Sequence, residues 1–373
     1  MDVVPSRPRR IDDFDSAPSL REGRIGMVAR RHGQIMESLL AEEPNPPCEP
    51  AAVLALLSAR GALVELRETR TSWVFLTPGD VFKLKKPVHD KDLDFRTADA
   101  RRRNSENEVR LNRRLAPDTY IGVVPVVRIG EALALGGEGR VIDWLVHMKR
   151  LPEGLFLDNL ARGGRIPRHR VEILAHRLAE FYAAAPTASA DPEEYRAQIR
   201  REILEARATL SHARFNLSPS FLRRIIGAQL RFVGSRSDPV CRPVEMGRIV
   251  EGHGDLRPEH IWLGAHPLVI DCLEFSYGLR CVSPFDELAY LGLECDRLGS
   301  GFIGPILIET AAERLGYRPP SALLAFYRSL RAIMRARFSL RHLLEPSPRQ
   351  PEKWPPLGRA YLRLADRAAS ELS

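Results

Sequence analysis

Short apolar runs alternate with turn residues through the first third of the chain, and this pattern predicts a β-sheet. The runs are rich in Val, Leu, Trp and Phe, and Pro and Gly stand in a four-residue turn between two of them. Runs of this length bounded by turn residues are typical of antiparallel strands. The predicted strands are Leu63–Leu66, Trp73–Leu76, Val81–Lys86, Gly122–Ile129 and Val141–Met148.

Helical spacing of apolar residues replaces this pattern in the rest of the chain. Two helices are also expected within the sheet region, Glu49–Arg60 and the charged segment Thr97–Leu115, which ends before Pro117. The helices expected after it are Leu155–Ala161, Arg168–Ala185, Pro192–His212, Ser218–Gly234, a helix opening at Ser283, Phe302–Leu315, Ser321–Leu344 and Leu357–Leu372. The fold class is therefore α+β, with a small antiparallel sheet lobe followed by a larger helical lobe.

Three parts of the chain follow from these elements. Residues 1–47 are rich in Arg, Pro, Asp and Ser and predict a flexible N-terminal extension, so that Met27 or Met36 could be the true start. Residues 48–150 form the expected sheet lobe and 151–373 the helical lobe. Pro and Gly in Met148–Gly154 interrupt the pattern, and we expect the hinge between the lobes there.

One stretch of the helical lobe predicts a hairpin that gathers polar residues. Ile261–Leu263 and Leu268–Ile270 are apolar and flank Gly264–Pro267. If Leu263 pairs with Leu268, then His260 lies opposite Asp271. A polar loop, residues 253–260, enters the first strand where Asp271 leaves the second. We therefore expect Asp255, His260 and Asp271 to converge.

Composition narrows the class of protein. The chain has 373 residues and a formal net charge of +8. Its five cysteines contain no C-x-x-C pair, which argues against a disulfide framework or structural zinc and fits a reducing cytoplasm. No apolar run reaches the roughly 18 residues that a membrane span needs. Basic charge without interleaved aromatic residues is usually a solvated face, so neither a nucleic-acid nor a membrane partner is expected.

The central stretch resembles a known family. His253-Gly254-Asp255 followed by Ile270-Asp271 is similar to the catalytic loop and metal-binding aspartate of the aminoglycoside phosphotransferases, small-molecule relatives of the protein kinases. The longer match, HGDLRPEHIWL, VIDCLEF and DELAYL, resembles a bacterial subgroup whose longer members carry an added P-loop ATP-binding domain; no G-x-x-x-x-G-K-[ST] occurs here. The resemblance covers about residues 50–345. It implies a two-lobed, protein-kinase-like fold and transfer of the γ-phosphate of ATP to a hydroxyl of a small molecule.

The resemblance also assigns roles within the loop and hairpin. Asp255 would accept the proton of the substrate hydroxyl, and Asp271 would hold Mg²⁺. His253 would orient the loop. Arg257 would contact either phosphate or a backbone carbonyl, and both readings stay open. His260 departs from the family, most members of which have Asn there as a second Mg²⁺ ligand. Imidazole suits Zn²⁺, Mn²⁺ or Ni²⁺ better, so His260 either binds a metal, with Mn²⁺ possible, or orients the loop by hydrogen bonding.

The sheet lobe supplies the candidates for nucleotide binding. A period of two places Lys83 and Lys85 on one face of their strand, and pairing Leu76 with Val81 sets Lys85 opposite Ser72. Lys85 is thus the first candidate for the phosphate-binding lysine and Lys83 the second, unless this strand is simply basic and solvated. The preceding loop has no glycine, so Thr69, Thr71 and Ser72 would have to serve the phosphates, unless it is an ordinary hairpin loop.

The charged helix supplies a candidate partner for the lysine. Glu108 shares a helix face with Leu111 and Leu115, so it could pair with the strand lysine as in kinases; Glu106 is the alternative, and an exposed ion pair is the ordinary fate of such a glutamate.

Two further carboxylates have secondary roles. Glu274 is a possible extra metal ligand, and Asp286 is expected to be structural, in a capping box at the start of a helix.

Three functions remain open on the sequence. The first is the ATP- and Mg²⁺-dependent phosphotransferase. The second is a nucleotide-binding, pseudokinase-like regulator, suggested by the glycine-free loop and His260. The third is a transition-metal hydrolase built on His253, Asp255, His260 and Asp271. The segment 302–373 carries 12 Lys+Arg and 6 Asp+Glu, a net of +6. Because acidic residues meet cationic drugs in the family, this charge argues against an aminoglycoside acceptor.

Overall fold

The computed structural model describes residues 48–372, except 60, 62, 91–92 and 236–238. These residues belong to one compact unit, Pro46–Ser373. The expected extension, residues 1–47, lies outside the described residues. Within the described part, no helix has both the length and the apolar character that a membrane crossing needs.

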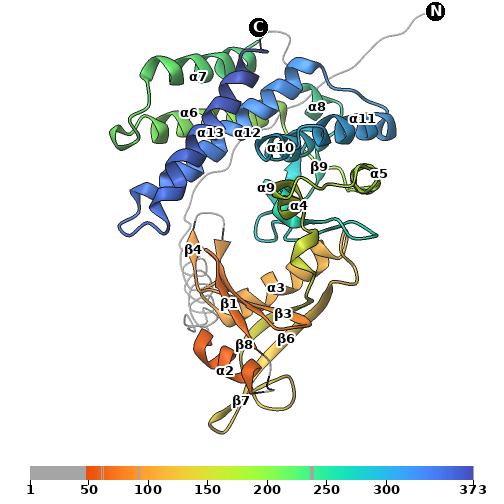
Figure 1. Cartoon of the computed structure of the whole chain (residues 1–373), viewed down its shortest axis with the longest axis vertical. Helices are drawn as coiled ribbons and strands as arrows, with labels where there is room; N and C mark the ends of the chain where they lie inside the picture. The colour runs from red at the N-terminus through yellow and green to blue at the C-terminus, as the bar shows by residue number, and fades with distance from the viewer. Residues whose placement is uncertain (1–47, 60, 62, 91–92, 236–238, 373) are drawn as a thin grey trace, which may run out of the picture. The chain divides into compact units, whose positions relative to one another are not determined.

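A six-stranded antiparallel sheet forms the first lobe, in the order β1-β2-β3-β8-β6-β7 (Figure 1). Its strands are β1 Glu65–Glu68, β2 Ser72–Leu76, β3 Asp80–Lys85, β6 Tyr120–Ile129, β7 Ala132–Leu135 and β8 Arg140–Lys149. A small hairpin, β4 His89–Asp90 and β5 Leu93–Asp94, follows β3. All five predicted strands are present, although the first covers Glu65–Glu68 rather than Leu63–Leu66, and β4, β5 and β7 were not foreseen.

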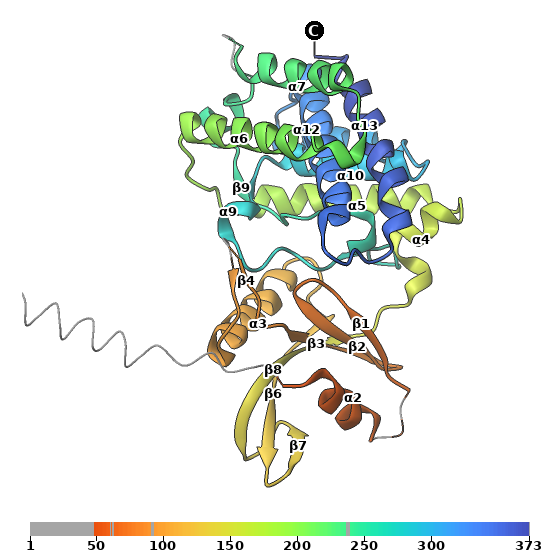
Figure 2. The ribbon, with the colours of Figure 1, turned by 90° about the vertical axis from the view of Figure 1, so that its left-hand side faces the viewer.

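Two helices cover opposite faces of this sheet, α2 Pro50–Ser58 and α3 Ala98–Asn112 (Figure 2). Phe82 and Leu84 of β3 pack in one apolar cluster with α2. Lys83 and Lys85 alternate with them and therefore point to the other face, where α3 lies. Thr97 caps α3 by accepting a hydrogen bond from the Ala100 N–H.

Helices make up most of the remaining chain. The α-helices are α4 Leu157–Arg162, α5 Arg168–Ala184, α6 Pro192–Leu210, α7 Pro219–Val233, α8 Arg242–Glu245, α9 Tyr277–Arg280, α10 Pro284–Arg297, α11 Ile303–Leu315, α12 Ser321–Arg341 and α13 Trp354–Ala369. The short elements are η1 Glu153–Leu155, η2 Ala213–Phe215, β9 Val250–Glu251, η3 Pro258–His260, β10 Ile261–Trp262, β11 Leu268–Val269, β12 Cys281–Val282, η4 His342–Leu344 and η5 Pro351–Lys353. One large apolar cluster joins these helices and includes Leu256, Ile261, Leu263 and Val269. The loop and hairpin singled out in the sequence are thus anchored in the core of the second lobe.

Candidate active site

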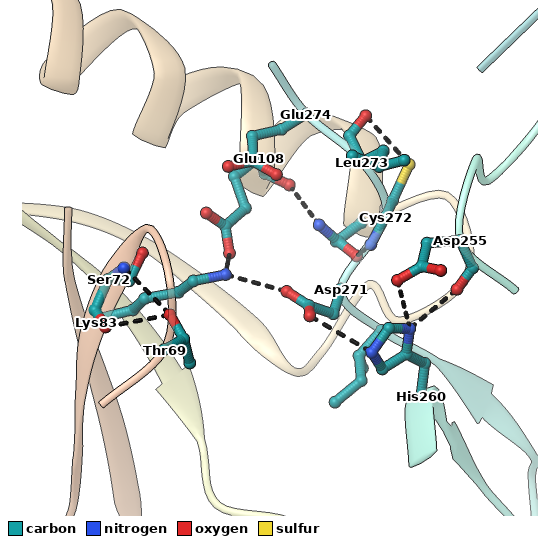
Figure 3. A network of polar contacts seen from close by, with 12 residues as sticks. Thr69, Ser72, Lys83, Glu108, Asp255, His260, Asp271, Cys272, Leu273 and Glu274 are labelled. Carbon is teal, nitrogen blue, oxygen red and sulfur yellow. Dashed lines mark hydrogen bonds and ion pairs between the residues drawn. The ribbon is translucent and has the colours of Figure 1, made fainter. Parts of the chain in front are cut away.

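Lys83 connects the two lobes at the centre of the candidate site. Its ammonium lies 2.9 Å from Glu108 Oε1 on α3 and 2.9 Å from Asp271 Oδ1 in the second lobe (Figure 3). The Lys83 side chain is 12% exposed and that of Asp271 45%. Three residues expected to act together are therefore in direct contact, although they come from three separate parts of the chain.

Lys83 and its carboxylate neighbours shift one another's pKa values. Desolvation would raise the pKa of the Asp271 carboxyl, but the neighbouring Lys83 ammonium outweighs it and holds that pKa well below its usual range. Desolvation alone would likewise lower the pKa of Lys83, but Asp271 and Glu108 raise it well above its ordinary value. Both groups are charged at neutral pH, so the site presents a fixed ammonium beside a fixed carboxylate.

Lys85 lies on the same face of β3 but is completely buried. Its ammonium is 2.5 Å from Glu108 Oε2 and 2.5 Å from Glu274 Oε1. Glu108 therefore serves both lysines, one with each oxygen. The sequence ranked Lys85 before Lys83 as the phosphate lysine; in the structure the partly exposed lysine beside Asp271 is Lys83. The predicted register that sets Lys85 opposite Ser72 is confirmed.

The hairpin after the polar loop pairs one residue out of the predicted register. Trp262 pairs with Leu268, and His260 accepts the N–H of Ile270 rather than facing Asp271 across the ladder. The turn is longer than expected because Leu263 leaves the strand, buries its side chain in the core and donates its N–H to Leu155.

The predicted convergence survives this shift. Asp271 has φ +61°, a left-handed conformation that is uncommon outside glycine, and its carboxylate Oδ2 lies 3.4 Å from His260 Nε2. The Asp271 N–H donates to the Tyr120 hydroxyl of β6. Such a conformation persists where the surroundings fix it, and it is concentrated at functional sites.

His253 begins the polar loop and ties it to the Asp271 segment. Its Nε2–H donates to the Ile270 carbonyl, and its Nδ1 accepts the Asp255 N–H. Burial lowers the pKa of His253 to about 3, so the ring is neutral and keeps this tautomer. These two bonds support the role expected of His253, which is to orient the loop.

Glu287 on α10 also holds this loop, a role that its sequence context does not predict. Its carboxylate accepts the N–H of His253 at 3.0 Å, the N–H of Gly254 and the hydroxyl of Tyr182 at 2.7 Å. Burial raises the pKa of Glu287, and these hydrogen bonds oppose that rise. The only signal in the sequence was a glutamate in a helix that is otherwise apolar on most positions.

Asp286, its neighbour, does not reach the loop. It forms a bidentate ion pair with Arg331 of α12, which fits the structural role expected of it. The expected capping box is wrong, because the Ser283 side chain makes no capping hydrogen bond to α10.

Asp255 is partly exposed and is paired with Arg257. Its side chain is 31% exposed, and its Oδ2 lies 3.0 Å from Arg257 Nη2. Arg257 also reaches Glu259 Oε1 at 2.8 Å. The guanidinium thus contacts two carboxylates, and its expected contact with phosphate or with a backbone carbonyl stays a prediction.

His260 uses its two ring nitrogens differently. Nδ1 lies 2.8 Å from the Asp255 carbonyl, which can only accept, so Nδ1 carries the proton. Nε2 lies 3.2 Å from Arg257 Nη2 and faces Asp271. With Nδ1 protonated, the Nε2 lone pair accepts the Arg257 guanidinium, so Nε2 could share a metal with Asp271 only once Arg257 turns away.

The turn between β1 and β2 is closed by its own hydrogen bonds. Thr69 Oγ1 and N–H both bond to Ser72, and Lys86 N–H donates to the Thr71 carbonyl. Ser72 is completely buried, and its hydroxyl has no hydrogen-bond partner among the described residues. Of the expected phosphate contacts, Thr71 stays near the surface and Ser72 does not.

Two candidate metal ligands, Asp271 and His260, lie together among the described residues. Among the described residues, no group of three or more His, Cys, Asp or Glu side chains has the arrangement of a metal centre. Catalytic zinc sites usually have three protein ligands, whereas Mg²⁺ in phosphoryl-transfer sites takes one or two carboxylates and completes its shell with phosphates and water. Asp271 with His260 fits the second arrangement in ligand number.

Comparison with solved structures identifies the fold. A choline/ethanolamine kinase family protein from Mesorhizobium loti superposes with a TM-score of 0.51 at 12% identity, covering 91% of this chain and 94% of its own. A choline kinase from Streptococcus pneumoniae gives 0.50 at 13% identity, covering 86% and 97%. The fold is a two-lobed, kinase-like α+β fold. The predicted fold class is confirmed, and these neighbours share it with the aminoglycoside phosphotransferases.

Sequence comparison adds relatives but no family. No family model matches the chain. Uncharacterised proteins of Mycobacterium tuberculosis and Mycobacterium bovis are 31% identical over 277 residues, which is 74% of this chain and 54% of each relative. The chain thus spans about half the length of these relatives. The predicted subgroup with an added P-loop domain stays a prediction.

Proposed function

We propose that the protein is a phosphotransferase that moves the γ-phosphate of ATP to a hydroxyl group of a small molecule. The contact of Lys83 with both Glu108 and Asp271 carries this proposal. Phosphoryl transfer relies on positioning and on charge stabilisation, and kinase-like sites use a strand lysine held by a helix glutamate next to a metal-binding aspartate. This set of three groups supports the proposal more directly than the loop motif alone.

Each residue has a defined task in this proposal. Lys83, rather than Lys85, neutralises phosphate oxygens, because it is partly exposed and lies beside Asp271. Asp255 accepts the proton of the acceptor hydroxyl. Asp271, with His260, would hold Mg²⁺, which when bound neutralises charge on the phosphate oxygens. Arg257 would have to turn from Asp255 toward the phosphates for the base to become free.

Label tracing tests the proposal. The full chain is incubated with γ-labelled ATP, Mg²⁺ and a pool of cellular metabolites, and the labelled product is separated and identified. Label in a small molecule supports the phosphotransferase. ATP binding without transfer to any acceptor would favour the nucleotide-binding regulator instead. Bound stoichiometric zinc without ATP binding would favour the hydrolase.

His260 provides a prediction about metal choice. The His260→Asn variant should keep activity and shift its preference from Mn²⁺ toward Mg²⁺, because Asn replaces a nitrogen ligand by an oxygen of similar reach. The measurement is the rate of transfer against the concentration of each metal, with circular dichroism as the check on folding. A folded variant that is inactive in both metals would contradict the kinase-like reading of this residue.

The net positive charge of residues 302–373 does not by itself exclude a cationic acceptor, because several of these arginines are paired. The arginines of α12 do not form an open basic surface, because Arg328, Arg331 and Arg335 pair with carboxylates of α10. The α10 carboxylates are therefore already ion-paired, and so are Asp255 and Glu259, which both pair with Arg257. The net of +6 in the segment is therefore largely balanced by residues outside it.

Paired carboxylates are poor partners for a polycationic substrate, because each must first give up its arginine. We therefore predict that kanamycin at micromolar concentration is not an efficient acceptor, and that the acceptor is neutral or anionic. The check is a coupled assay of ADP release with kanamycin against the acceptor found by label tracing. Efficient phosphorylation of kanamycin would overturn the prediction.

A further inference from the structure

The segment from Asp271 to Glu274 belongs to the second lobe but is bound to the first lobe at three of its four residues. The Asp271 N–H donates to the Tyr120 hydroxyl, and the Cys272 N–H donates to Asn112 Oδ1 at 2.9 Å. At the end of the segment, the Glu274 carbonyl accepts from Asn107 and the Glu274 carboxylate accepts from Lys85. The candidate metal residue is thus the first residue of a segment docked on β3, β6 and α3.

Lys85 has a place in this docking that differs from that of Lys83. It is completely buried, and its ammonium is satisfied by Glu108 and Glu274, so it has no free face for a phosphate. A buried lysine is costly unless it is paired, and here each of its two carboxylate partners comes from a different lobe. Lys85 therefore links the two lobes without touching the space beside Asp271.

Formal charges show what this link contributes. Lys83 and Lys85 supply two positive charges against three negative charges on Glu108, Asp271 and Glu274, a net of −1. Removing Lys85 and Glu274 together leaves the same net of −1. The pair consequently adds no charge to the site, and what it adds is a connection between β3 and the end of the Asp271 segment.

We propose that Lys85 and Glu274 are positioning residues that hold the Asp271 segment against the first lobe, so that Asp271 meets its metal in one fixed place. Through Glu108, which bonds both lysines, the same pair also fixes the orientation of the carboxylate that holds Lys83. The part of this proposal that concerns the metal rests on the proposed function. The docking itself does not.

Amide hydrogen exchange of the full chain tests the docking independently of activity. The amides of Asp271, Cys272 and Leu273 are all hydrogen-bonded and should be protected in the unaltered protein. In Glu274→Gln and in Lys85→Met we expect their exchange to rise at least about tenfold, with no change in α5. Glu274→Gln leaves Lys85 paired with Glu108 and is therefore the variant more certain to fold.

A neighbouring lysine gives the matched control. Lys86 bonds Glu68 and the Thr69 carbonyl instead of the Asp271 segment. Lys86→Met should leave exchange at residues 271–273 unchanged. Unchanged exchange there in Glu274→Gln and Lys85→Met as well, or an equal rise throughout the second lobe, would overturn the proposal, because either result describes a residue that only stabilises the fold.

Metal binding tests the second step. Binding of Mn²⁺ in the presence of a non-hydrolysable ATP analogue, followed by electron paramagnetic resonance, should weaken about tenfold in Glu274→Gln, within the range found when partners of metal ligands are removed. The double variant Lys85→Met/Glu274→Gln keeps the net charge and should remain weak. Recovery of metal binding and of protection in the double variant would show that charge balance, not the link, matters, and would refute the proposal.

The two hypotheses fail in different ways. If the unaltered protein binds no metal–nucleotide complex and transfers no label, the proposed function is wrong, while the exchange pattern still decides whether the segment is docked by this pair. If the unaltered protein transfers phosphate but the variants keep both protection and metal affinity, the proposed function stands and the positioning role is wrong.

Discussion

The Asp255→Asn variant should lose phosphate transfer by a factor of about 10²–10⁴ in kcat while still binding Mg·ATP. General-base catalysis contributes this much in enzymes, and the amide cannot accept the proton of the acceptor hydroxyl. Asn keeps the size of Asp, and the loop is held by Glu287 through backbone N–H groups rather than by the Asp255 carboxylate. The fold and the nucleotide site should therefore remain intact.

The measurement compares label transfer to the identified acceptor with the affinity for a non-hydrolysable ATP analogue. Asp271→Asn is the matched comparison, and it should weaken metal–nucleotide binding itself, because Asp271 is the carboxylate beside Lys83. Asn also tolerates the left-handed backbone at this position better than most residues. Full transfer activity in a folded Asp255→Asn variant would remove Asp255 from the proposed mechanism.

The Asp143→Ala variant should lower the free energy of unfolding by about 3–5 kcal/mol, the usual cost of removing one partner of a buried ion pair. Asp143 on β8 and Arg101 on α3 are both completely buried, and the carboxylate accepts from Arg101 Nε and Nη2 at 3.0 Å. It also accepts the N–H of Cys48 just before α2. Truncation leaves a guanidinium in the core without its carboxylate and loosens both helices that cover the sheet.

Urea unfolding followed by circular dichroism measures this effect. The control is Glu106→Ala on the same helix, which removes an exposed pair with Arg102 and should shift the midpoint far less. Equal midpoints for the two variants would mean that the buried pair does not stabilise the first lobe as its burial indicates.

Local patterns were enough to predict five strands and both helices of the first lobe, but not β4, β5 or β7. The Pro-Gly turn after β2 fixes the register of β2 with β3, so that Ser72 opposite Lys85 follows from the sequence alone. Alternation then assigns Lys83 and Lys85 to one face. What the pattern could not give is which lysine meets Asp271, because that depends on how far each side chain lies from a segment 188 residues away.

The β10–β11 hairpin shows the limit of the same reasoning. Its register depends on Leu263, which the pattern assigns to the strand but which instead enters the core and bonds Leu155. A one-residue slip normally reverses the side-chain faces. Here the left-handed backbone of Asp271 returns its carboxylate to His260, so the expected neighbours meet by a different route.

The residues that hold the site were harder to foresee than those expected to react. Tyr120, Asn112 and Glu287 lie in ordinary strand and helix contexts, and nothing in their local pattern separates them from residues that only pack. Their roles come from contacts between elements distant in the chain. A sequence motif can indicate the reacting residues, but the residues that hold them in place are found only from the three-dimensional structure.

Glu287 grips the polar loop by main-chain atoms, at the amides of His253 and Gly254, from a helix that begins more than twenty residues later. Because Glu287 bonds the backbone of the loop, the path of the loop does not depend on most of its side chains. Over evolutionary time such a loop can exchange its chemistry residue by residue without losing its path, and an imidazole can stand at position 260 where an amide stands in similar sites. We then expect Glu287 to be constant, and variation within the loop to fall outside His253-Gly254-Asp255.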